Sequence, residues 1–374
     1  MKTAIKFISL FLALAMVLSL AACGKQNTSS DGELASDTVT VTDHVGNEVT
    51  VKKNAKRIVV CDIYPLPSVL SVFFDSAERI VGMAGPSMTA AKNGLLSELY
   101  PEILDAKTDF INGTSINVEE IMKLRPDVVF YSAGTAQIGE QLKNAGIPAI
   151  AISAGKWQYD AIETLNNWIS LLSQIFPEND RTEAVRKYSK EVYDRVQNKV
   201  KDIPENEREK VFFLFQYSES SITTSGKLFF GQWWADAIGA VNVAGVLETD
   251  HSTAVNIEQI YGWDPEHILI TNFNSAQPDD LYKNTIGNYD WSAVSAVKNK
   301  KVYKMPLGIY RSYTCGADTP VTLLWLAKTV YPELFADVDI TAETKQYYEK
   351  AFGITLTDAQ AQSIFAPTSD ASAF

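Results

Sequence analysis

Arg311 stands in an irregular segment, PLGIYRSYTCGADTP, that follows an apolar run in the last quarter of the chain. A guanidinium offers a rigid fork of donors that binds a carboxylate or an oxyanion through two hydrogen bonds. The neighbouring rings of Tyr310 and Tyr313 can stack on a flat ligand. The segment therefore predicts a site for an anionic ligand. The alternative is that Arg311 is a surface residue among core aromatics.

Several other polar and aromatic side chains lie just after apolar runs that have the composition of strands. In parallel α/β sheets, ligands bind beyond the carboxyl ends of the strands, so these side chains are candidate ligand contacts. Of the adjacent pair Trp233 and Trp234, one normally faces the core of a helical segment, so at most one is expected to meet a ligand. The candidates besides Arg311 are Tyr64, Ser87, Tyr131, Gln216, Tyr217, Trp233, Asn272, Tyr310 and Tyr313.

Metal coordination and catalysis have weaker support in the sequence. None of the three histidines has metal-ligand spacing with another; His251, in the polar ETDHST loop, is a weak candidate metal ligand, and His44 and His267 favour structural roles. Gly-x-Ser-x-Gly, GxxxxGK[ST] and His-Glu-x-x-His motifs are absent, so no catalytic residue is predicted. Cys61 reads as a buried apolar residue and Cys315 as a loop residue that can be exposed; a bridge between them stays open.

The apolar runs alternate with helical stretches in two separate parts of the chain. A hairpin with a Gly46-Asn47 turn begins the first part, and short apolar runs with helices between them follow. Residues 159–203 have no strand signal and read as long amphipathic helix, with a break at Pro177–Asp180. The fold class is therefore α/β, with two similar lobes of mostly parallel sheet joined by one long helix. The predicted boundaries are 38–158 for the first lobe, 159–203 for the connecting helix and 204–374 for the second lobe with its closing helices.

One sequence template occurs once in each lobe. NVEEIMKLRPDVVFYS begins at Asn117, and NIEQIYGWDPEHILIT begins at Asn256. Each has an Asn that can cap a helix, a Glu two residues later, and a Pro before an apolar run. We interpret the pair as one element placed equivalently in two similar halves.

The amino-terminal residues have the character of an export signal. Two lysines precede an apolar run that ends at Leu20, and small residues lead into Cys23. The sequence LAAC also resembles the bacterial lipoprotein signal, which implies removal of residues 1–22 and lipid on Cys23. Residues 23–37 are small and polar, as suits a flexible tether. The alternative is an ordinary secreted protein in which Cys23 is incidental.

Charge narrows the possible partners. The formal net charge is −12, which argues against nucleic acid or anionic lipid as the main partner. Without its signal the chain has about 350 residues, which suggests two domains rather than one.

Four features together resemble the substrate-binding proteins of ABC importers, in the branch that captures siderophores, haem and cobalamin. They are the segments TVTDHVGNEVTVKKNAKRIVV, NVEEIMKLRPDVVF and GQWWADAIGAVNVAG, and the long middle helix. Some members of this branch take up molybdate or tungstate. The resemblance implies a monomer that binds its ligand between two lobes, has no intrinsic cofactor, and shows little closure because the connecting helix is rigid. It also implies a location at the extracytoplasmic face of the cell membrane.

By the same resemblance, Glu119 and Glu258 contact the permease dimer, which works with separate ATPase subunits. The alternative is that both acids only complement the dipoles of the helices that they begin. The ligand implied is an iron complex such as a ferric siderophore, with haem, cobalamin or molybdate as alternatives. Two rival functions remain at this point, an anchored surface enzyme and a sensory or adhesion lipoprotein.

Overall fold

The structure, a computed structural model, describes residues 37–372. The predicted signal peptide (1–22), the lipidated Cys23 and nearly all of the predicted tether therefore lie outside the described residues. Within the described range, no helix is both long enough and apolar enough to cross a membrane. The predicted amino-terminal hairpin is present as an antiparallel pair of strands, with Gly46 at a positive φ in its turn. Its strands are β1 (Thr38–Thr42) and β2 (Glu48–Lys52).

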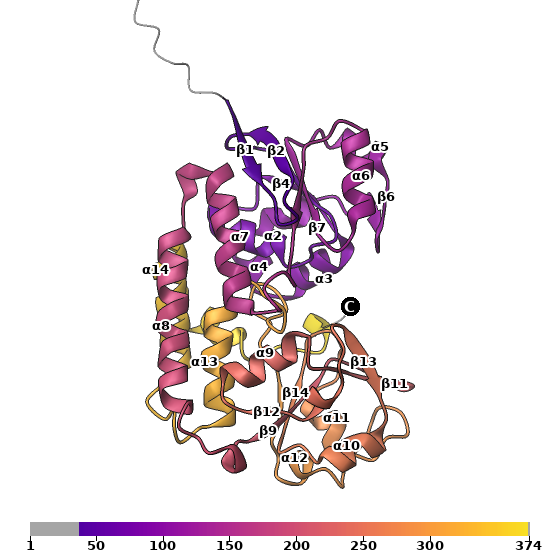
Figure 1. Cartoon of the computed structure of the whole chain (residues 1–374), viewed down its shortest axis with the longest axis vertical. Helices are drawn as coiled ribbons and strands as arrows, with labels where there is room; N and C mark the ends of the chain where they lie inside the picture. Colours follow the sequence, from indigo (N-terminus) through magenta and orange to yellow (C-terminus); the bar gives the residue numbers. More distant parts are fainter. Residues whose placement is uncertain (1–36, 373–374) are drawn as a thin grey trace, which may run out of the picture. The chain divides into compact units, whose positions relative to one another are not determined.

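The first lobe is built on a parallel sheet of four strands in the order β4-β3-β7-β8 (Figure 1). The strands are short runs of β-branched and apolar residues that are buried on both faces, as parallel strands generally are. Alternate residues of β7 pack into two different core clusters: Phe130 faces one, and Val129 and Tyr131 face the other. The strands are β3 (Ile58–Val60), β4 (Ile80–Met83), β7 (Val128–Ser132) and β8 (Ala149–Ile152).

Short helices cover both faces of this sheet. Pro65, Pro86 and Pro101 each lie at or next to the start of a helix, where the missing N–H of proline costs nothing. A two-stranded hairpin, β5 (Ile111–Asn112) with β6 (Ser115–Ile116), leads into α5. The helices are α2 (Leu66–Phe74), α3 (Gly85–Asn93), α4 (Leu95–Leu99), the 3-10 helix η1 (Pro101–Asp105), α5 (Val118–Lys123) and α6 (Ala136–Asn144).

The second lobe repeats the plan. Its parallel sheet has the order β12-β9-β14-β15, so in both lobes the second strand of the chain lies at one edge, followed by the first, third and fourth. In both lobes the helix of the repeated template comes directly before the third strand. The sequence interpretation of one element placed equivalently in two halves is thus confirmed. The strands are β9 (Lys210–Leu214), β12 (Val241–Asn242), β14 (His267–Ile270) and β15 (Val302–Lys304).

An antiparallel sheet of three strands distinguishes the second lobe from the first. It has the order β10-β11-β13, and it brings the ends of β10 and β11 beside the carboxyl end of β9. Its strands are β10 (Gln216–Ser218), β11 (Ser221–Ser225) and β13 (Ser252–Val255). The helices of the lobe are α9 (Phe230–Ala237), α10 (Ile257–Trp263), α11 (Pro278–Lys283) and α12 (Ser295–Lys298), with two 3-10 helices, η3 (Glu205–Glu207) and η4 (Val243–Val246).

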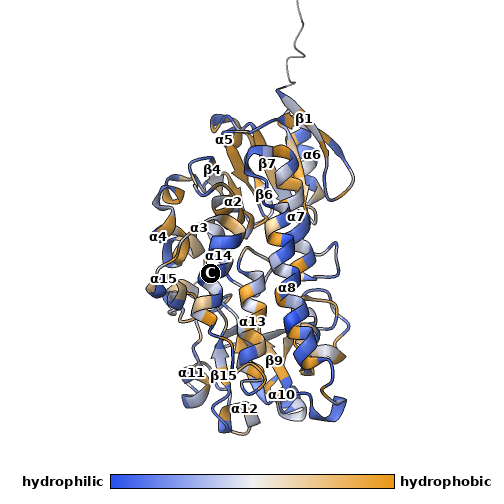
Figure 2. Ribbon diagram, turned by 90° about the vertical axis from the view of Figure 1, so that its left-hand side faces the viewer, coloured by the Kyte–Doolittle hydropathy of each residue, from blue (hydrophilic) through white to orange (hydrophobic). Residues whose placement is uncertain are grey.

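The connecting segment contains two α-helices rather than one continuous helix. The first, α7, ends at Ile175; a 3-10 turn begins at Pro177, where the sequence predicted a break, and α8 follows for 19 residues. Both helices are amphipathic, and Figure 2 shows polar and apolar residues alternating along them. The elements are α7 (Ala161–Ile175), η2 (Pro177–Asn179) and α8 (Thr182–Val200).

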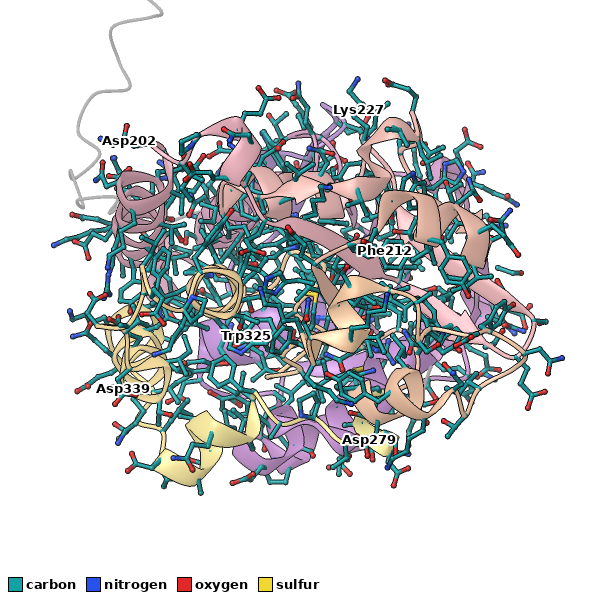
Figure 3. The ribbon with its side chains drawn as sticks, turned by 90° about the horizontal axis from the view of Figure 1, so that it is seen from below. Asp202, Phe212, Lys227, Asp279, Trp325 and Asp339 are labelled. Carbon is teal, nitrogen blue, oxygen red and sulfur yellow. The ribbon has the colours of Figure 1, made fainter. Side chains whose placement is uncertain are left out.

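Helices close the chain and pack against α8. The apolar faces of α13 and α14 meet α8, which places a large shared core beside the two sheets. In Figure 3 the charged residues Asp202, Lys227, Asp279 and Asp339 lie at the outer surface, whereas Phe212 of β9 is fully buried. The closing elements are α13 (Thr319–Val330), α14 (Ile340–Phe352), α15 (Asp358–Ser363) and the 3-10 helix η5 (Asp370–Ser372).

Candidate ligand-binding site

Loops at the carboxyl ends of the first sheet are tied together. Tyr64 follows β3, and Ser87 lies in the first turn of α3, which follows β4. The Ser87 hydroxyl donates to the carbonyl oxygen of Tyr64 at 2.8 Å, so Ser87 positions the Tyr64 loop. Tyr64 itself is half-buried, and burial followed by the nearby Asp62 carboxylate raises the pKa of its phenol. The first lobe therefore offers a fixed tyrosine at the point where the order of its strands reverses.

The loop after β15 joins the two lobes directly. The Leu95 N–H of the first lobe donates to the Gly308 carbonyl of the second lobe at 3.1 Å. A Cβ on Gly94 would lie 3.0 Å from that carbonyl oxygen, and Gly308 has φ +53° with the Asp318 carboxylate against it. A side chain at position 94 would crowd the Gly308 carbonyl, and one at position 308 would be strained by the positive φ and would clash with the Asp318 carboxylate, so glycine suits both positions. Burial raises the pKa of Asp318 to about 6, and Tyr348 and the Ile309 N–H donate to its carboxylate.

Arg311 lies in the same loop and is buried, with 1% of its surface exposed. Its guanidinium carbon is 5.2 Å from the centre of the Phe273 ring and 5.7 Å from that of Tyr310. Burial raises the pKa of Tyr310 to about 12, and the positive charge of Arg311 opposes the rise. The Tyr64 phenol of the first lobe also raises this pKa slightly. The sequence alternative of a surface Arg311 is therefore wrong.

A second buried cation fixes the neighbouring loop. The Lys304 ammonium, at the end of β15, donates to the carbonyls of Thr271 (3.0 Å), Asn274 (2.7 Å) and Ala276 (2.8 Å). Burial lowers the pKa of Lys304 to about 7; the Asp280 carboxylate opposes this shift and the charge of Arg311 adds to it. Lys304 thus holds the loop 271–276 in place beneath Phe273. Lys304 is not among the residues predicted from the sequence; a lysine that ends an otherwise apolar strand was the available signal.

An aromatic wall extends from Arg311 along the second lobe. The rings of Phe273 and Phe215 stack at 4.9 Å, Phe215 meets Phe229 at 6.0 Å, and Phe229 meets Tyr159 at 5.0 Å. The Tyr159 hydroxyl, from the segment between β8 and α7, donates to the Asp250 carbonyl of the second lobe at 3.1 Å. Aromatic faces in such a row suit a ligand with flat, unsaturated groups.

Two cavities open along this wall. One, of about 430 Å³, is lined by Trp157, Tyr159, Phe229 and the half-buried Trp233. Trp234 instead is fully buried, and its indole N–H donates to the Tyr313 carbonyl at 2.7 Å, so Trp233 is the member of the pair that meets a cavity. The other, of about 400 Å³, is lined by Gln216, Tyr217, Phe273, Asn274 and three serines.

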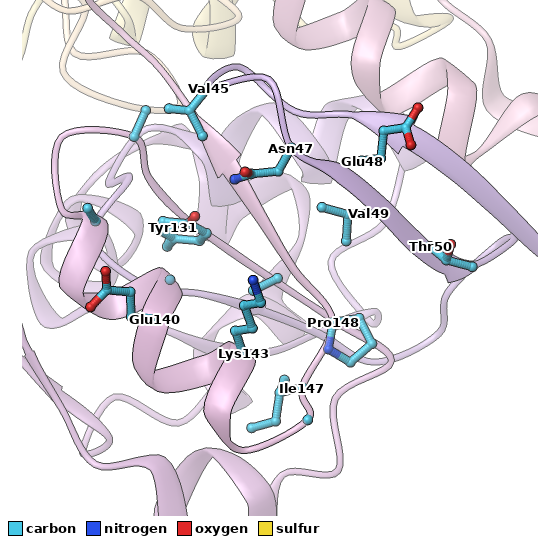
Figure 4. A pocket seen from close by; sticks show the side chains of 15 residues that line it. Val45, Asn47, Glu48, Val49, Thr50, Tyr131, Glu140, Lys143, Ile147 and Pro148 are labelled. Carbon is cyan, nitrogen blue, oxygen red and sulfur yellow. The ribbon is translucent and has the colours of Figure 1, made fainter.

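Not all of the predicted ligand contacts reach these cavities. Tyr131 lies within β7 rather than after it, and its ring faces α6, where a Cβ on Gly139 would meet its hydroxyl (Figure 4). Tyr313 is fully buried among core aromatics, with its ring beside Phe213 and Phe230. For Tyr131 the period of two along a strand sets the direction of the side chain, and the sequence analysis placed the end of the strand too early.

Asn272 and Tyr217 use their polar groups inside the protein. The Asn272 amide donates to the carbonyls of Met305 and Pro306 at 2.7 and 2.8 Å, and it has no exposed surface. The Tyr217 hydroxyl donates to the Ile286 carbonyl at 2.7 Å and accepts from the Trp291 indole. Asn272 therefore positions the loop of Arg311, whereas the Tyr217 ring still lines a cavity. That the remaining candidates bind a ligand stays a prediction.

The histidines and cysteines form no metal site with one another. His251 is exposed, with its ring 2.9 Å from the Asp250 carboxylate, and His44 accepts from the Ser153 N–H at 3.1 Å. Within residues 37–372 no group of three or more His, Cys, Asp or Glu side chains could hold a metal. Cys61 and Cys315 are both buried and unbridged, so the prediction of an exposed Cys315 is wrong.

The repeated template is a capped helix in both lobes. The Asn117 side chain accepts from the N–H groups of Glu119 and Glu120, and that of Asn256 accepts from Gln259, whose side chain accepts from Asn256 in return. Glu119 and Glu258 are exposed, and no cap uses their carboxylates. Figure 1 shows α5 and α10 on the side of their lobes that is turned away from α8.

Comparison with known proteins gives one family and several relatives. The family described as "Periplasmic binding protein" matches residues 83–307. The molybdate-binding protein MolA of Haemophilus influenzae is 24% identical over 83% of this chain and 90% of its own length. An uncharacterized ABC transporter substrate-binding lipoprotein of Bacillus subtilis, YvrC, is 25% identical over 87% of this chain and 97% of its own.

Solved structures share the fold. A periplasmic solute binding protein of Veillonella parvula has a TM-score of 0.78 and 30% identity, over 88% of this chain and 97% of its own. MolA bound to molybdate has a TM-score of 0.70 and 22% identity, over 85% of this chain and 99% of its own. The two-lobe arrangement of this chain is thus the arrangement of known solute-binding structures.

Proposed function

The chain belongs to the periplasmic binding protein family, and from that premise we propose that it captures an anionic metal compound for an ABC importer. The first candidate is an iron complex of the siderophore type. The work of the protein is capture and release, with no chemical conversion of the ligand. ATP hydrolysis belongs to separate subunits, because the sequence has no phosphate-binding GxxxxGK[ST] motif.

One observation carries the choice of an anionic ligand. Arg311 is a buried cation beside the rings of Phe273 and Tyr310, in the loop that follows the parallel strand β15 and contacts the first lobe at Leu95. Buried guanidinium groups are strong partners for carboxylates and oxyanions because the charge is poorly screened there. The aromatic wall from Phe273 to Tyr159 supports a ligand with flat rings, as a chelate has.

A compact oxyanion is the second candidate. MolA, which is related over most of this chain, is named for binding molybdate. Molybdate or tungstate would use Arg311 without the aromatic wall. The two candidates therefore differ in whether Phe215, Phe229 and Trp233 contribute to affinity.

The location and the partners follow from the family and the sequence. We propose that Cys23 carries lipid and holds the protein at the extracytoplasmic face of the cell membrane, as the name of the lipoprotein YvrC supports for a relative. Glu119 and Glu258 are proposed to meet the permease dimer, one from each lobe. Both carboxylates are exposed and neither takes part in a helix cap, so they are available to a partner.

Titration of the purified protein tests the ligand. Seven tryptophans give a fluorescence signal, and Trp157 and Trp233 line a cavity of the wall. The probes are a ferric catecholate siderophore, haem, cobalamin and sodium molybdate. We expect saturable binding of at least one probe, and a loss of about tenfold or more in affinity for Arg311→Gln, because the charge-assisted contacts are lost.

The matched control is Arg186→Gln, which removes an exposed guanidinium from α8 and leaves the wall intact. Phe215→Leu then separates the candidates, since it should weaken the siderophore and leave molybdate unchanged. Binding of none of the four probes would refute the proposed ligand class. Equal affinity of the Arg311→Gln variant and the unchanged protein would refute the role of Arg311.

A further inference from the structure

The described end of the chain lies between the two lobes. The Leu307 N–H of the second lobe donates to the Ile364 carbonyl at 3.0 Å, and η5 packs against α3 of the first lobe (Figure 1). The Ser372 hydroxyl donates to the Asn272 side-chain oxygen of the second lobe at 2.7 Å. Ala371 and Ser372 have 2% and 0% of their surface exposed. Short polar segments outside the helices and strands of a core are usually exposed, so this burial indicates a specific binding surface for the segment.

The segment has its own internal hydrogen bonds. The Ser372 N–H donates to the Ser369 carbonyl at 3.1 Å, and the Ala371 N–H donates to the Thr368 hydroxyl at 3.4 Å. The Ser372 hydroxyl also lies 3.2 Å from the Thr368 carbonyl. These bonds fold residues 368–372 into a compact turn that presents Ser372 to Asn272.

The surfaces under this turn adjoin the candidate ligand site. In the first lobe, α3 carries Ser87, which holds the Tyr64 loop. In the second lobe, Asn272 holds the loop that leads to Arg311, and it is next to Phe273 of the aromatic wall. A segment that touches both elements lies beside the loops that carry Tyr64 and Arg311, where it would obstruct a ligand that binds between the lobes.

We infer that residues 366–372 are an intramolecular occupant of the ligand site and that a ligand must displace them. The inference rests on the proposed function, since it needs the ligand to bind between the lobes. Competition of this kind multiplies the intrinsic affinity by the fraction of molecules whose site is open. A segment seated in nine of ten molecules therefore weakens the measured affinity about tenfold.

A peptide experiment tests the occupant without any metal compound. A variant that ends at Phe365 lacks the segment, and the synthetic peptide APTSDASAF restores it in trans. We expect saturable binding of the peptide to the shortened protein, followed by tryptophan fluorescence. Neither a scrambled peptide nor the full-length protein should give the signal, because in the full-length protein the seat is already filled. Absence of peptide binding to a shortened protein that retains its circular dichroism would overturn the inference.

Ligand affinity gives the second test. With ferric catecholate siderophore and sodium molybdate as probes, the shortened protein should bind about tenfold more tightly than the full chain. Ser372→Trp, which places a large ring where no space is left, should give the same gain in the full-length chain if the shortened one does not fold. Ser369→Ala changes an exposed side chain of the same turn and should leave affinity unchanged.

The two proposals fail separately. Peptide binding without binding of any probe would refute the ligand class and leave the occupant standing. Probe binding of equal strength in the full-length, shortened and Ser372→Trp proteins would refute the occupant and leave the proposed function standing.

Discussion

The two lobes are alike on their outer helices and unlike at the carboxyl ends of their strands. Both place a capped helix with an exposed Glu before the third strand of the same strand order. After that strand, however, the first lobe fixes its loop with one half-exposed acid: the Ser132 N–H donates to Asp62 at 2.8 Å. The second lobe uses the buried Lys304, which binds three carbonyls and supports Phe273.

The shared outer helices follow from the repeated fold, whereas the unequal strand ends are where a ligand would bind. A shared strand order gives each lobe the same frame, and a partner that meets both lobes can use equivalent residues on each. A ligand between the lobes meets two unequal surfaces, and the second lobe carries the buried cations and most of the aromatic wall. We therefore expect substitutions on the outer helices to act symmetrically and those at the strand ends to act mainly from the second lobe.

The largest expected effect is on transport. Replacement of both Glu119 and Glu258 by Ala should lower ligand uptake by cells about tenfold or more while ligand affinity stays unchanged, since rim charges govern encounter and register. Uptake of radiolabelled or coloured ligand, beside fluorescence titration of the purified protein, measures the two effects. Each single variant should show an uptake between those of the double variant and the unchanged protein, and the two single variants should have similar uptake.

The control for this pair is Glu120→Ala with Gln259→Ala, which changes the neighbouring residue of each helix. Uptake equal to that of the unchanged protein in the Glu119→Ala, Glu258→Ala double variant would contradict the docking role and favour a sensory or adhesion lipoprotein. A loss of uptake in only one of the two single variants would contradict the expected symmetry of the two lobes.

The second expected effect is on stability. Lys304→Met should lower the free energy of unfolding by about 2 to 4 kcal/mol, because it leaves buried carbonyls of the loop 271–276 without their donor. Asp62→Ala in the first lobe should cost only about 1 kcal/mol, since Asp62 is half-exposed and water can replace it. Urea unfolding followed by circular dichroism measures both.

Lys92→Met, at an exposed position of α3, is the control for removal of a charge. Equal losses for Lys304→Met and Asp62→Ala would show that the two loops are fixed with similar strength, contrary to the comparison of the lobes.

The sequence predicted the fold better than it predicted the site. Alternating apolar runs are read reliably because every strand of a parallel sheet is buried, and the repeated template placed the third strand of each lobe. Side-chain direction was harder. Tyr131 lies within its strand and not after it, and the Tyr313 side chain is buried in the core. Tertiary packing decides such directions, and one sequence does not reveal it.

Lys304 and the end of the chain show a different limit. A lysine among apolar residues and a polar carboxyl terminus both look like solvated surface by composition. Lys304 donates to backbone carbonyls and Ser372 donates to Asn272. These partners lie 28 to 100 positions away in the chain. Long-range partners of this kind leave no local pattern.

The smallest expected effect lies within the shared helices and gives the most precise comparison of the lobes. Asn117→Ala and Asn256→Ala should each cost about 1 kcal/mol through the loss of a cap. Only Asn256 shares a reciprocal box with the third helical residue, Gln259, whereas Glu120 pairs with Lys123 instead. A double-mutant cycle should therefore give a coupling of about 0.5 kcal/mol for Asn256 with Gln259 and close to zero for Asn117 with Glu120. Amide hydrogen exchange in α5 and α10 measures the effect of each cap locally. Equal coupling energies in the two lobes would mean that the Glu120 side chain binds the Asn117 N–H in solution, contrary to this prediction.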